Sequence, residues 1–507
     1  MPSSESVVTP AAVDWFGPRP VGSDLKGRSV RGGITTLLAQ GASHGLRLIT
    51  TLVLARLLSP AEFGIVATVM SAIGILGLFR EMGLSAATVQ RPVVTESQVN
   101  TLFWINLALG AGAMVIAAAA APMVLAFFGD QRLLGVTLAM STTFLFNGLS
   151  TQHMALLRRQ LRFTILARIS VACTLASSLV SLALAAAGAR YWALVVATVG
   201  SSVLCAILAW HHCTWRPQRP AFDSSVRGMF NFGRYLVVYG LVGFLAQNAH
   251  NVAIGKLWGA AGVGLYGRAY LLYTMLMSYV LQPPHAVAVS TLSGLRGEPE
   301  RFRRVYLRIL AVMMLVAIPL SAYLVLAAED IVRLLLGPGW ERSATILRWL
   351  ALSGLVQPIS FSSGWLYMSR GNSRGMMWWG IFGWTLLLLA LLAGVPFGLE
   401  GVAAAYTLSQ FFLVVPCMLY AFRDTPLHLN DLPGLIWRPA AAAAAAGAAL
   451  LALRAQWPQL HWIGHMIVEG LAFAVVYGGL IGSAPAQRAL IADILRQLRG
   501  GIPPPPV

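Results

Sequence analysis

The side chains of this sequence that could do chemistry are polar and ionisable groups set inside long apolar segments. His44 and Arg47 are three residues apart in one such segment, so a helix would present both on one face. Arg47 lies about fourteen residues into that segment, which at about 1.5 Å per residue places it near mid-membrane. An ionisable group at that depth is costly and usually faces a cavity or a partner. We therefore predict that both residues line a binding cavity.

A second group of polar residues lies in the other half of the chain. Gln247 follows Arg47 by 200 residues, so both halves place a polar side chain at an equivalent depth. The other candidates in this half are Asn248, His250, Asn251, Arg268 and Tyr270. Tyr270 belongs to a stripe of tyrosines that fits either helix packing or stacking on a sugar. His44 and His250 likewise fit either packing or binding.

Arg168 and Arg234 lie within a turn or two of the predicted inner membrane surface. They fit either a cavity lining or an anchor, because long cationic side chains can reach the interface from within a span. Carboxylates are nearly absent from these segments. Since a buried uncompensated cation costs several kcal/mol, the pattern favours a hydrated cavity that binds an anionic headgroup. The spacing matches no catalytic or metal-binding motif, so we predict no catalytic residue and no metal site.

The elements that must position these residues are membrane-spanning helices. Of the 507 residues, 57% are hydrophobic and 11% are charged, with a mean hydropathy of +0.71. A soluble domain has about 25% charged residues, so the composition argues against a water-soluble enzyme, and it excludes a disordered chain. We predict an all-α polytopic membrane protein with fourteen spans: 33–57, 62–79, 101–127, 133–156, 164–188, 191–210, 229–256, 262–284, 306–328, 344–367, 376–396, 400–421, 436–453 and 463–482.

The basic residues predict the topology. The net charge is +18, and most Lys and Arg residues fall on inner loops when the N-terminus is placed in the cytoplasm. The charge therefore sets membrane orientation, with both termini cytoplasmic, and no nucleic-acid partner is expected. Ala55–Ile65 resembles Gly255–Leu265 at an offset of 200 residues. This repeat predicts two six-helix lobes related by a two-fold axis along the membrane normal, plus two C-terminal helices.

The predicted organisation has six parts. They are a cytoplasmic tail over 1–32, an N-terminal lobe over 33–211, a cytoplasmic inter-lobe loop over 212–228, a C-terminal lobe over 229–422, two extra helices over 423–483 and a cytoplasmic tail over 484–507. The outer loops are short, so no extramembrane domain is expected to hold an active site.

Six motifs of the sequence resemble those of one transporter family. They are Leu54–Gly64, Arg80–Ala87, Thr101–Asn106, Leu156–Phe163, Tyr191–Val195 and Asn248–Lys256. The chain is thereby similar to Wzx-type polysaccharide flippases, the exopolysaccharide and lipopolysaccharide branch of the multidrug/oligosaccharidyl-lipid/polysaccharide exporter superfamily. One departure is His250, where relatives commonly have Asp. It removes a mid-span carboxylate and puts in doubt any ion coupling that used one.

The resemblance implies a transporter rather than an enzyme. It implies that undecaprenyl-pyrophosphate-linked oligosaccharide crosses from the cytoplasmic to the periplasmic leaflet of a bacterial inner membrane by alternating access. The expected partners are this substrate, membrane lipids, a polymerase and other polysaccharide-assembly proteins. No cofactor is expected, and coupling to Na⁺ or H⁺ is left open. The alternatives are a flippase for a peptidoglycan or teichoic precursor and a cation-coupled multidrug exporter, although a basic cavity suits cationic drugs poorly.

Overall fold

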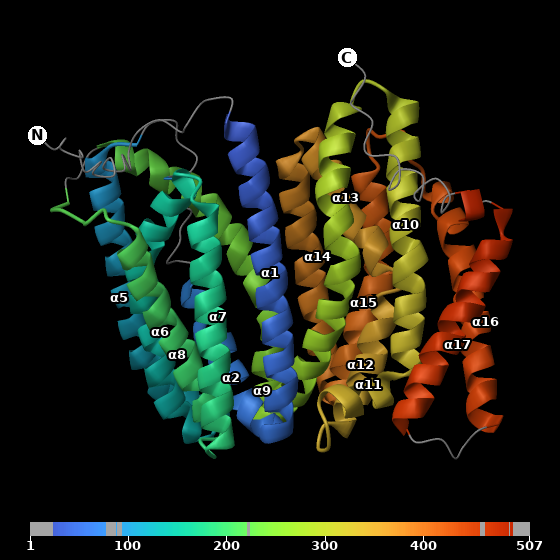
Figure 1. Cartoon of the computed structure of the whole chain (residues 1–507), viewed down its shortest axis with the longest axis horizontal. Coiled ribbons are helices and arrows are strands. Elements are labelled where there is room, and N and C mark those ends of the chain that lie inside the picture. Colours follow the sequence, from blue (N-terminus) through green and yellow to red (C-terminus); the bar gives the residue numbers. More distant parts are fainter. Residues whose placement is uncertain are drawn as a thin grey trace, which may run out of the picture. The chain divides into compact units, whose positions relative to one another are not determined.

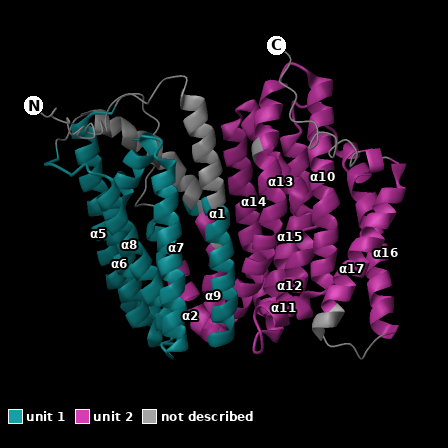
Figure 2. Cartoon of the chain, in the orientation of Figure 1, with its two compact units in different colours: residues 1–57, 72–241 teal, residues 58–71, 242–507 magenta. Residues whose placement is uncertain are grey.

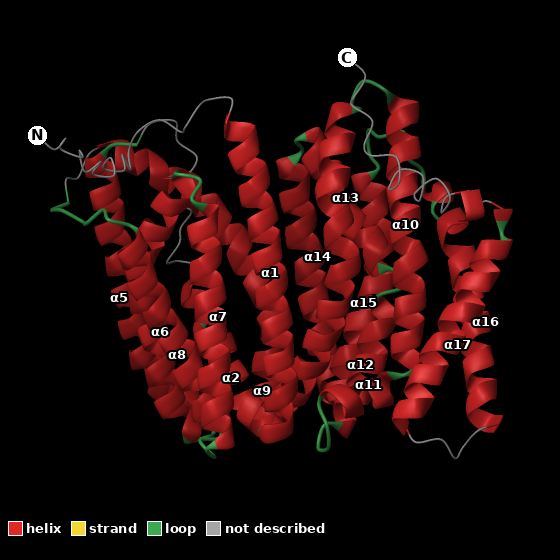
Figure 3. Ribbon diagram, in the orientation of Figure 1, coloured by secondary structure: helices red, strands yellow, loops and turns green. Residues whose placement is uncertain are grey.

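The computed structural model describes residues 24–77, 88, 94–220, 224–456, 462–485 and 487–489. Within these ranges all regular structure is helical, and no strand is present (Figure 3). The motif at Arg80–Ala87, most of the predicted N-terminal tail and the end of the C-terminal tail lie outside the described residues. The predicted all-α class is confirmed for the part of the chain that is described.

The helices form two compact units (Figure 2). The first comprises residues 1–57 and 72–241, and the second comprises residues 58–71 and 242–507. The first unit holds α1 (Asp24–Leu57), α5 (Glu96–Phe128), α6 (Arg132–Arg159), α7 (Phe163–Ala186), α8 (Trp192–His212) and the start of α9 (Ser224–Gly294). Within it, α1 packs against α7 and α5 packs against α6 (Figure 1).

The second unit contains one early helix and the C-terminal half of the chain. It holds α2 (Pro60–Ile73), the rest of α9, α10 (Pro299–Leu326), α11 (Ala328–Leu335), α12 (Glu341–Ser353), α13 (Gln357–Arg370), α14 (Ser373–Gly394), η1 (Val395–Phe397), α15 (Gly398–Ala421), η2 (Leu429–Asp431), α16 (Pro433–Gln456) and α17 (Trp462–Ser483). Here α14 packs against α15, and α16 packs against α17 (Figure 1).

A backbone contact explains why α2 belongs to the second unit. A Cβ atom added to Gly64 of α2 would lie 1.5 Å from the carbonyl oxygen of Ala260 in α9. A Cβ atom on Gly264 would lie 1.8 Å from the carbonyl oxygen of Pro60. Because neither position has room for a side chain, the two helices cross with their backbones touching. This crossing carries residues 58–71 into the second unit.

Within the described residues, each predicted span lies mostly on helix, and residues 78–79 of the span 62–79 are outside them. The spans 229–256 and 262–284 lie on the single helix α9, which is interrupted at Gly259 (φ 65°, ψ −171°). The span 344–367 consists of α12 and α13, which bend by 49°. Helix α1 begins at Asp24, inside the predicted tail, and α9 begins at Ser224, inside the predicted inter-lobe loop.

The described residues form a multi-pass membrane protein. Eight of their helical segments are long and apolar enough to cross a membrane, and the bent α12–α13 pair makes nine. One of the eight, Ser373–Ala421, holds two predicted spans. Helix α1 is long enough, but polar residues such as His44 and Arg47 lower its hydropathy. The total of fourteen spans stays a prediction.

Candidate functional site

The second unit contains a buried group of aromatic rings, which we call the aromatic cluster: His250, Tyr266, Tyr270, Tyr273 and Tyr406. The imidazole ring of His250 lies 4.9 Å from the ring of Tyr266 and 6.1 Å from that of Tyr270. Tyr266 and Tyr270 stack at 6.2 Å, and Tyr406 of α15 meets Tyr270 edge-on at 6.0 Å. Two predicted site residues, His250 and Tyr270, are therefore brought together.

Two features of the sequence assemble this cluster. The tyrosines of α9 are spaced four and three residues apart, so they share one helical face. His250 lies before the interruption at Gly259 and Tyr266 lies after it. In a straight helix these two residues would be about 24 Å apart. The break at Gly259 therefore folds the two arms of α9 together.

Tyr273 connects the cluster to the bend between α12 and α13. Its hydroxyl donates to Oε1 of Gln357 at 2.7 Å and accepts from Oγ of Ser353 at 2.7 Å. Tyr273 is fully buried, so these partners replace the water that its hydroxyl loses.

Other polar atoms near the cluster are buried without a partner in the described residues. They are Nδ1 of His250, Oδ1 of Asn251 and the hydroxyl of Tyr266. An unsatisfied buried polar atom costs about 1–3 kcal/mol. Such atoms can be kept when a ligand or water satisfies them in another state of the protein. The cluster is therefore a candidate polar binding site within the second unit.

Arg268 and Asn248 have partners on α2. The guanidinium carbon of Arg268 lies 4.2 Å from the ring centre of Phe63, so an aromatic face partly compensates its charge. Oδ1 of Asn248 accepts from the hydroxyl of Ser71 at 3.4 Å, while its Nδ2 donates to the carbonyl of Phe244 at 3.0 Å. Both residues therefore join α9 to α2.

The remaining predicted residues lie on other parts of the chain. His44 and Arg47 are exposed on α1, and Arg168 is exposed on α7. These three side chains have no hydrogen-bond or ion-pair partner among the described residues. Arg234 and Gln247 lie on α9, but their side chains are outside the described ones. That all these residues line one cationic cavity stays a prediction.

The sequence did not single out Tyr406 of the cluster, Ser353, which donates to Tyr273, or Phe63, which contacts Arg268. Tyr406 lies in a mainly apolar helix, and Phe63 looks like an ordinary lipid-facing residue at the start of α2. The one sequence feature that pointed to such contacts was the stripe of tyrosines in α9, because buried tyrosines need aromatic or polar partners.

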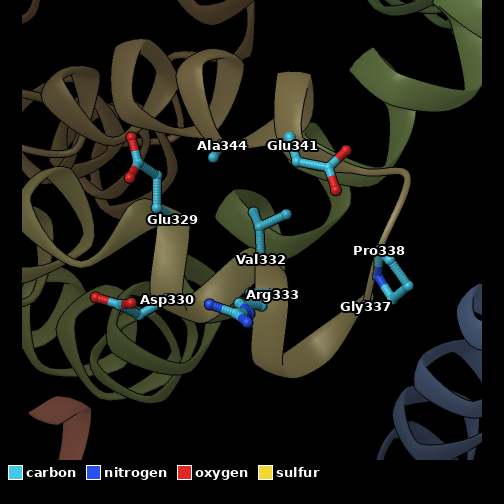
Figure 4. A pocket seen from close by; sticks show the side chains of 8 residues that line it. All are labelled: Glu329, Asp330, Val332, Arg333, Gly337, Pro338, Glu341 and Ala344. Atoms are coloured by element: carbon cyan, nitrogen blue, oxygen red, sulfur yellow. The ribbon is translucent and has the colours of Figure 1, made fainter. Parts of the chain in front are cut away.

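A separate hollow of about 610 Å³ lies beside α11 and α12 (Figure 4). Its acidic residues are already engaged. Glu329 pairs with Arg348 at 3.0 Å, and Asp330 pairs with Arg454 at 3.0 Å. Glu341 accepts the backbone N–H of Gly339 at 2.9 Å. Glu329 and Asp330 of α11 are therefore paired with cations of α12 and α16.

The fold is that of a known class of membrane transporters. The lipid II flippase MurJ in an inward closed conformation matches with a TM-score of 0.70 at 13% identity, covering 91% of this chain and 100% of that one. An inward-facing multidrug resistance MATE transporter of the MOP superfamily matches with a TM-score of 0.60 at 14% identity, covering 75% and 93%. The protein is thus a polytopic membrane protein whose fold is similar to those of these two transporters.

The family model described as "Polysaccharide biosynthesis protein" matches residues 53–345, and this chain belongs to that family. TuaB of Bacillus subtilis, a teichuronic acid biosynthesis protein, is 27% identical over 63% of this chain and 66% of its own. WzxC of Escherichia coli, a lipopolysaccharide biosynthesis protein, is 21% identical over 80% and 85%. ExoT of Rhizobium meliloti, a succinoglycan biosynthesis transport protein, is 25% identical over 68% and 70%. The resemblance to polysaccharide flippases is confirmed.

Proposed function

We propose that this protein moves undecaprenyl-pyrophosphate-linked oligosaccharide repeat units from the cytoplasmic to the periplasmic leaflet of a bacterial inner membrane. The product would feed exopolysaccharide or lipopolysaccharide synthesis. The observation that carries the proposal is the pair His44 and Arg47. Both lie exposed on the predicted membrane-spanning part of α1, with no partner in the described residues. A cation at that depth is explained if an anionic cargo meets it.

The physical problem for such a cargo is its headgroup. The polyprenyl tail can stay in the lipid, whereas a pyrophosphate with attached sugars loses its hydration on crossing. Guanidinium groups such as those of Arg47 and Arg268 would replace that water with charge-assisted hydrogen bonds. Tyr270 and the other rings of the aromatic cluster offer flat faces and hydroxyl groups to sugars. Rocking of two lobes would then expose the bound headgroup to each side in turn.

The membrane potential supplies one component of the driving force. With both termini in the cytoplasm, an inside-negative potential favours outward movement of each negative charge by about 2.3 kcal/mol per 100 mV. Coupling to Na⁺ or H⁺ would add to this. His250 stands where a carboxylate is common in relatives, and it can itself exchange a proton. A polymerase and other polysaccharide-assembly proteins are the expected partners.

A second candidate is a flippase for a different lipid-linked precursor. It is favoured by TuaB, named for teichuronic acid synthesis, and by MurJ, named for lipid II. The mechanism would be the same and only the cargo would differ. A multidrug exporter is less favoured, because the unpartnered ionisable residues on the part of α1 with described side chains, from residue 39 on, are His44 and Arg47 rather than carboxylates.

The test is export in cells that carry Arg47→Ala at matched expression. We expect polymer export to fall and a lipid-linked intermediate to accumulate. Arg56→Ala is the control, since Arg56 lies on the same helix at a predicted membrane surface. Undiminished export by Arg47→Ala would contradict the role of Arg47. Mass spectrometry of the accumulated lipid would identify the sugar and separate the two candidate cargoes.

A further inference from the structure

Helices α14 and α15 enclose a hollow at the end of the pair where α14 begins and α15 ends. Its volume is about 490 Å³, and it is separate from both the aromatic cluster and the acidic hollow. The lining residues are Trp378, Trp379, Phe382, Pro416, Leu419, Tyr420 and Arg423. We call it the tryptophan hollow. Its walls are apolar except for one cation and three aromatic side chains that carry a polar group.

The aromatic rings of the tryptophan hollow hold Arg423 in place. Tyr420 stacks on Trp379 with ring centres 6.0 Å apart, and the guanidinium carbon of Arg423 lies 5.5 Å from the ring centre of Tyr420. Arg370, at the end of α13, donates to the backbone carbonyl of Arg423 at 2.7 Å. The side chain of Arg423 is therefore positioned by stacking and its backbone by a second arginine.

The hydrogen-bond donors of this hollow are unused. Within the described part of the chain, neither the guanidinium of Arg423 nor the indole N–H groups of Trp378 and Trp379 have a hydrogen-bond partner. The nearby carboxylate of Asp424 is 85% exposed and lies 3.8 Å from Arg370. Charge and donors at the mouth of the hollow are thus complementary to an anion with several acceptor oxygens.

The depth of the hollow indicates what kind of anion fits. Pro416 lies five residues before Ala421, the last residue of α15, which corresponds to about 7.5 Å along the helix, and Arg423 lies in the turn that follows. Half the hydrocarbon core of a bilayer is about 15 Å thick. The hollow therefore spans about half the depth of one leaflet. The exposed Arg423 lies beyond the helix end, beside two exposed or half-buried tryptophans of the type found at membrane interfaces. The part of an acyl chain next to the headgroup fits this depth, whereas a free phosphate would leave the apolar walls uncovered.

We propose that the tryptophan hollow binds one anionic phospholipid, with its phosphate on Arg423 and an acyl chain along Pro416 and Leu419. This site is independent of the translocated cargo. It ties α13, α14 and α15 to one leaflet, at an end of the second unit that also carries Arg370 and Arg374.

The experiment is native mass spectrometry of the full-length protein in detergent, with phosphatidylglycerol or phosphatidylcholine of identical acyl chains added. We expect the wild type to retain phosphatidylglycerol preferentially, and Arg423→Gln to lower that retention roughly fivefold. Trp378→Leu combined with Trp379→Leu should also lower it, with the charge unchanged. Arg438→Gln is the matched control, because Arg438 also stacks on a tryptophan, Trp437, at 5.2 Å but does not line the hollow.

Folding is checked by the melting temperature of each variant in detergent without added lipid. Equal retention of phosphatidylglycerol by the wild type and Arg423→Gln would overturn the proposal. Equal retention of the two phospholipids by the wild type would overturn it as well. Displacement of phosphatidylglycerol by an equimolar amount of undecaprenyl phosphate would also contradict the assignment, since it would make the hollow a site for the cargo lipid. An effect of Arg423→Gln on lipid retention with undiminished polymer export would support a site separate from transport.

Discussion

The imidazole ring of His250 lies 4.9 Å from the ring of Tyr266, although sixteen residues separate them on one helix. The contact exists because α9 breaks at Gly259 and folds back along itself. One residue without a side chain therefore decides whether the predicted site residues His250 and Tyr270 meet.

Substitution of Gly259 should disrupt this arrangement. Its φ of 65° and ψ of −171° lie in a region that is essentially restricted to glycine, and no neighbouring atom restricts the space around it. We expect Gly259→Ala to lower stability by about 1–3 kcal/mol, measured as a shift of the thermal unfolding midpoint in detergent. Gly267→Ala is the control, because Gly267 has an ordinary helical backbone and open space. Equal midpoints for the two variants would show that the break does not depend on Gly259.

Two tyrosines of the aromatic cluster should respond differently to loss of their hydroxyl groups. Tyr273→Phe removes the partner of both Gln357 and Ser353, and we expect a loss of about 1–2 kcal/mol. Tyr266→Phe removes a buried hydroxyl that has no partner in the described residues, so stability should stay the same or rise. Both variants keep the ring and its packing. The test is the thermal unfolding midpoint of each variant, measured under the same conditions. A lower midpoint for Tyr266→Phe than for Tyr273→Phe would contradict these hydrogen-bond assignments.

A pH effect is expected where the chain turns between α5 and α6. Arg132 donates from Nε to Oδ1 of Asp130 at 2.9 Å and from Nη2 to Oδ2 at 2.8 Å, and these hydrogen bonds lower the pKa of Asp130. A carboxyl whose pKa is lower in the folded than in the unfolded state stabilises the fold above its unfolded pKa, near 3.9. That stability is lost as the pH falls through the folded value. The wild type should therefore be more stable than Asp130→Asn at pH 7, and the difference should shrink below about pH 4. A difference that stays constant down to pH 3 would exclude this pair as its source.

The sequence predicted the helices well, because hydropathy records which segments cross a membrane. Within the described residues, every predicted span lies mostly on helix. The sequence could not predict the contacts of the site, because these depend on a close helix crossing and a helix break at glycine residues. Gly64 lets α2 touch α9 and so places Phe63 under Arg268, while Gly259 turns α9 back on itself. In the sequence, a glycine that breaks a helix cannot be told from one that permits a close helix crossing or one that has no special role.

A buried ion pair anchors the last two helices to the rest of the second unit. Arg454 of α16 donates to both oxygens of Glu469 in α17, at 2.7 and 2.8 Å, and to Asp330 of α11 at 3.0 Å. The side chain of Glu469 is only 2% exposed. Arg454→Met would leave that carboxylate buried without its cation, so we expect a loss of about 3 kcal/mol.

A double substitution separates the cost of the unpaired charge from the value of the pair. Arg454→Met combined with Glu469→Met should be more stable than Arg454→Met alone, because the carboxylate of Glu469 is no longer buried without its cation. Asp330 loses Arg454 in both variants, so it does not contribute to the difference. Arg301→Met is the matched control. It breaks the pair with Glu298, in which both side chains are about half exposed, and it should cost no more than about 1 kcal/mol. Unfolding free energies of the three variants measured in one detergent test this order. If the double variant is instead the least stable of the three, the expected order is wrong. The ion pair of Arg454 and Glu469 then contributes more to the unfolding free energy than buried pairs usually do.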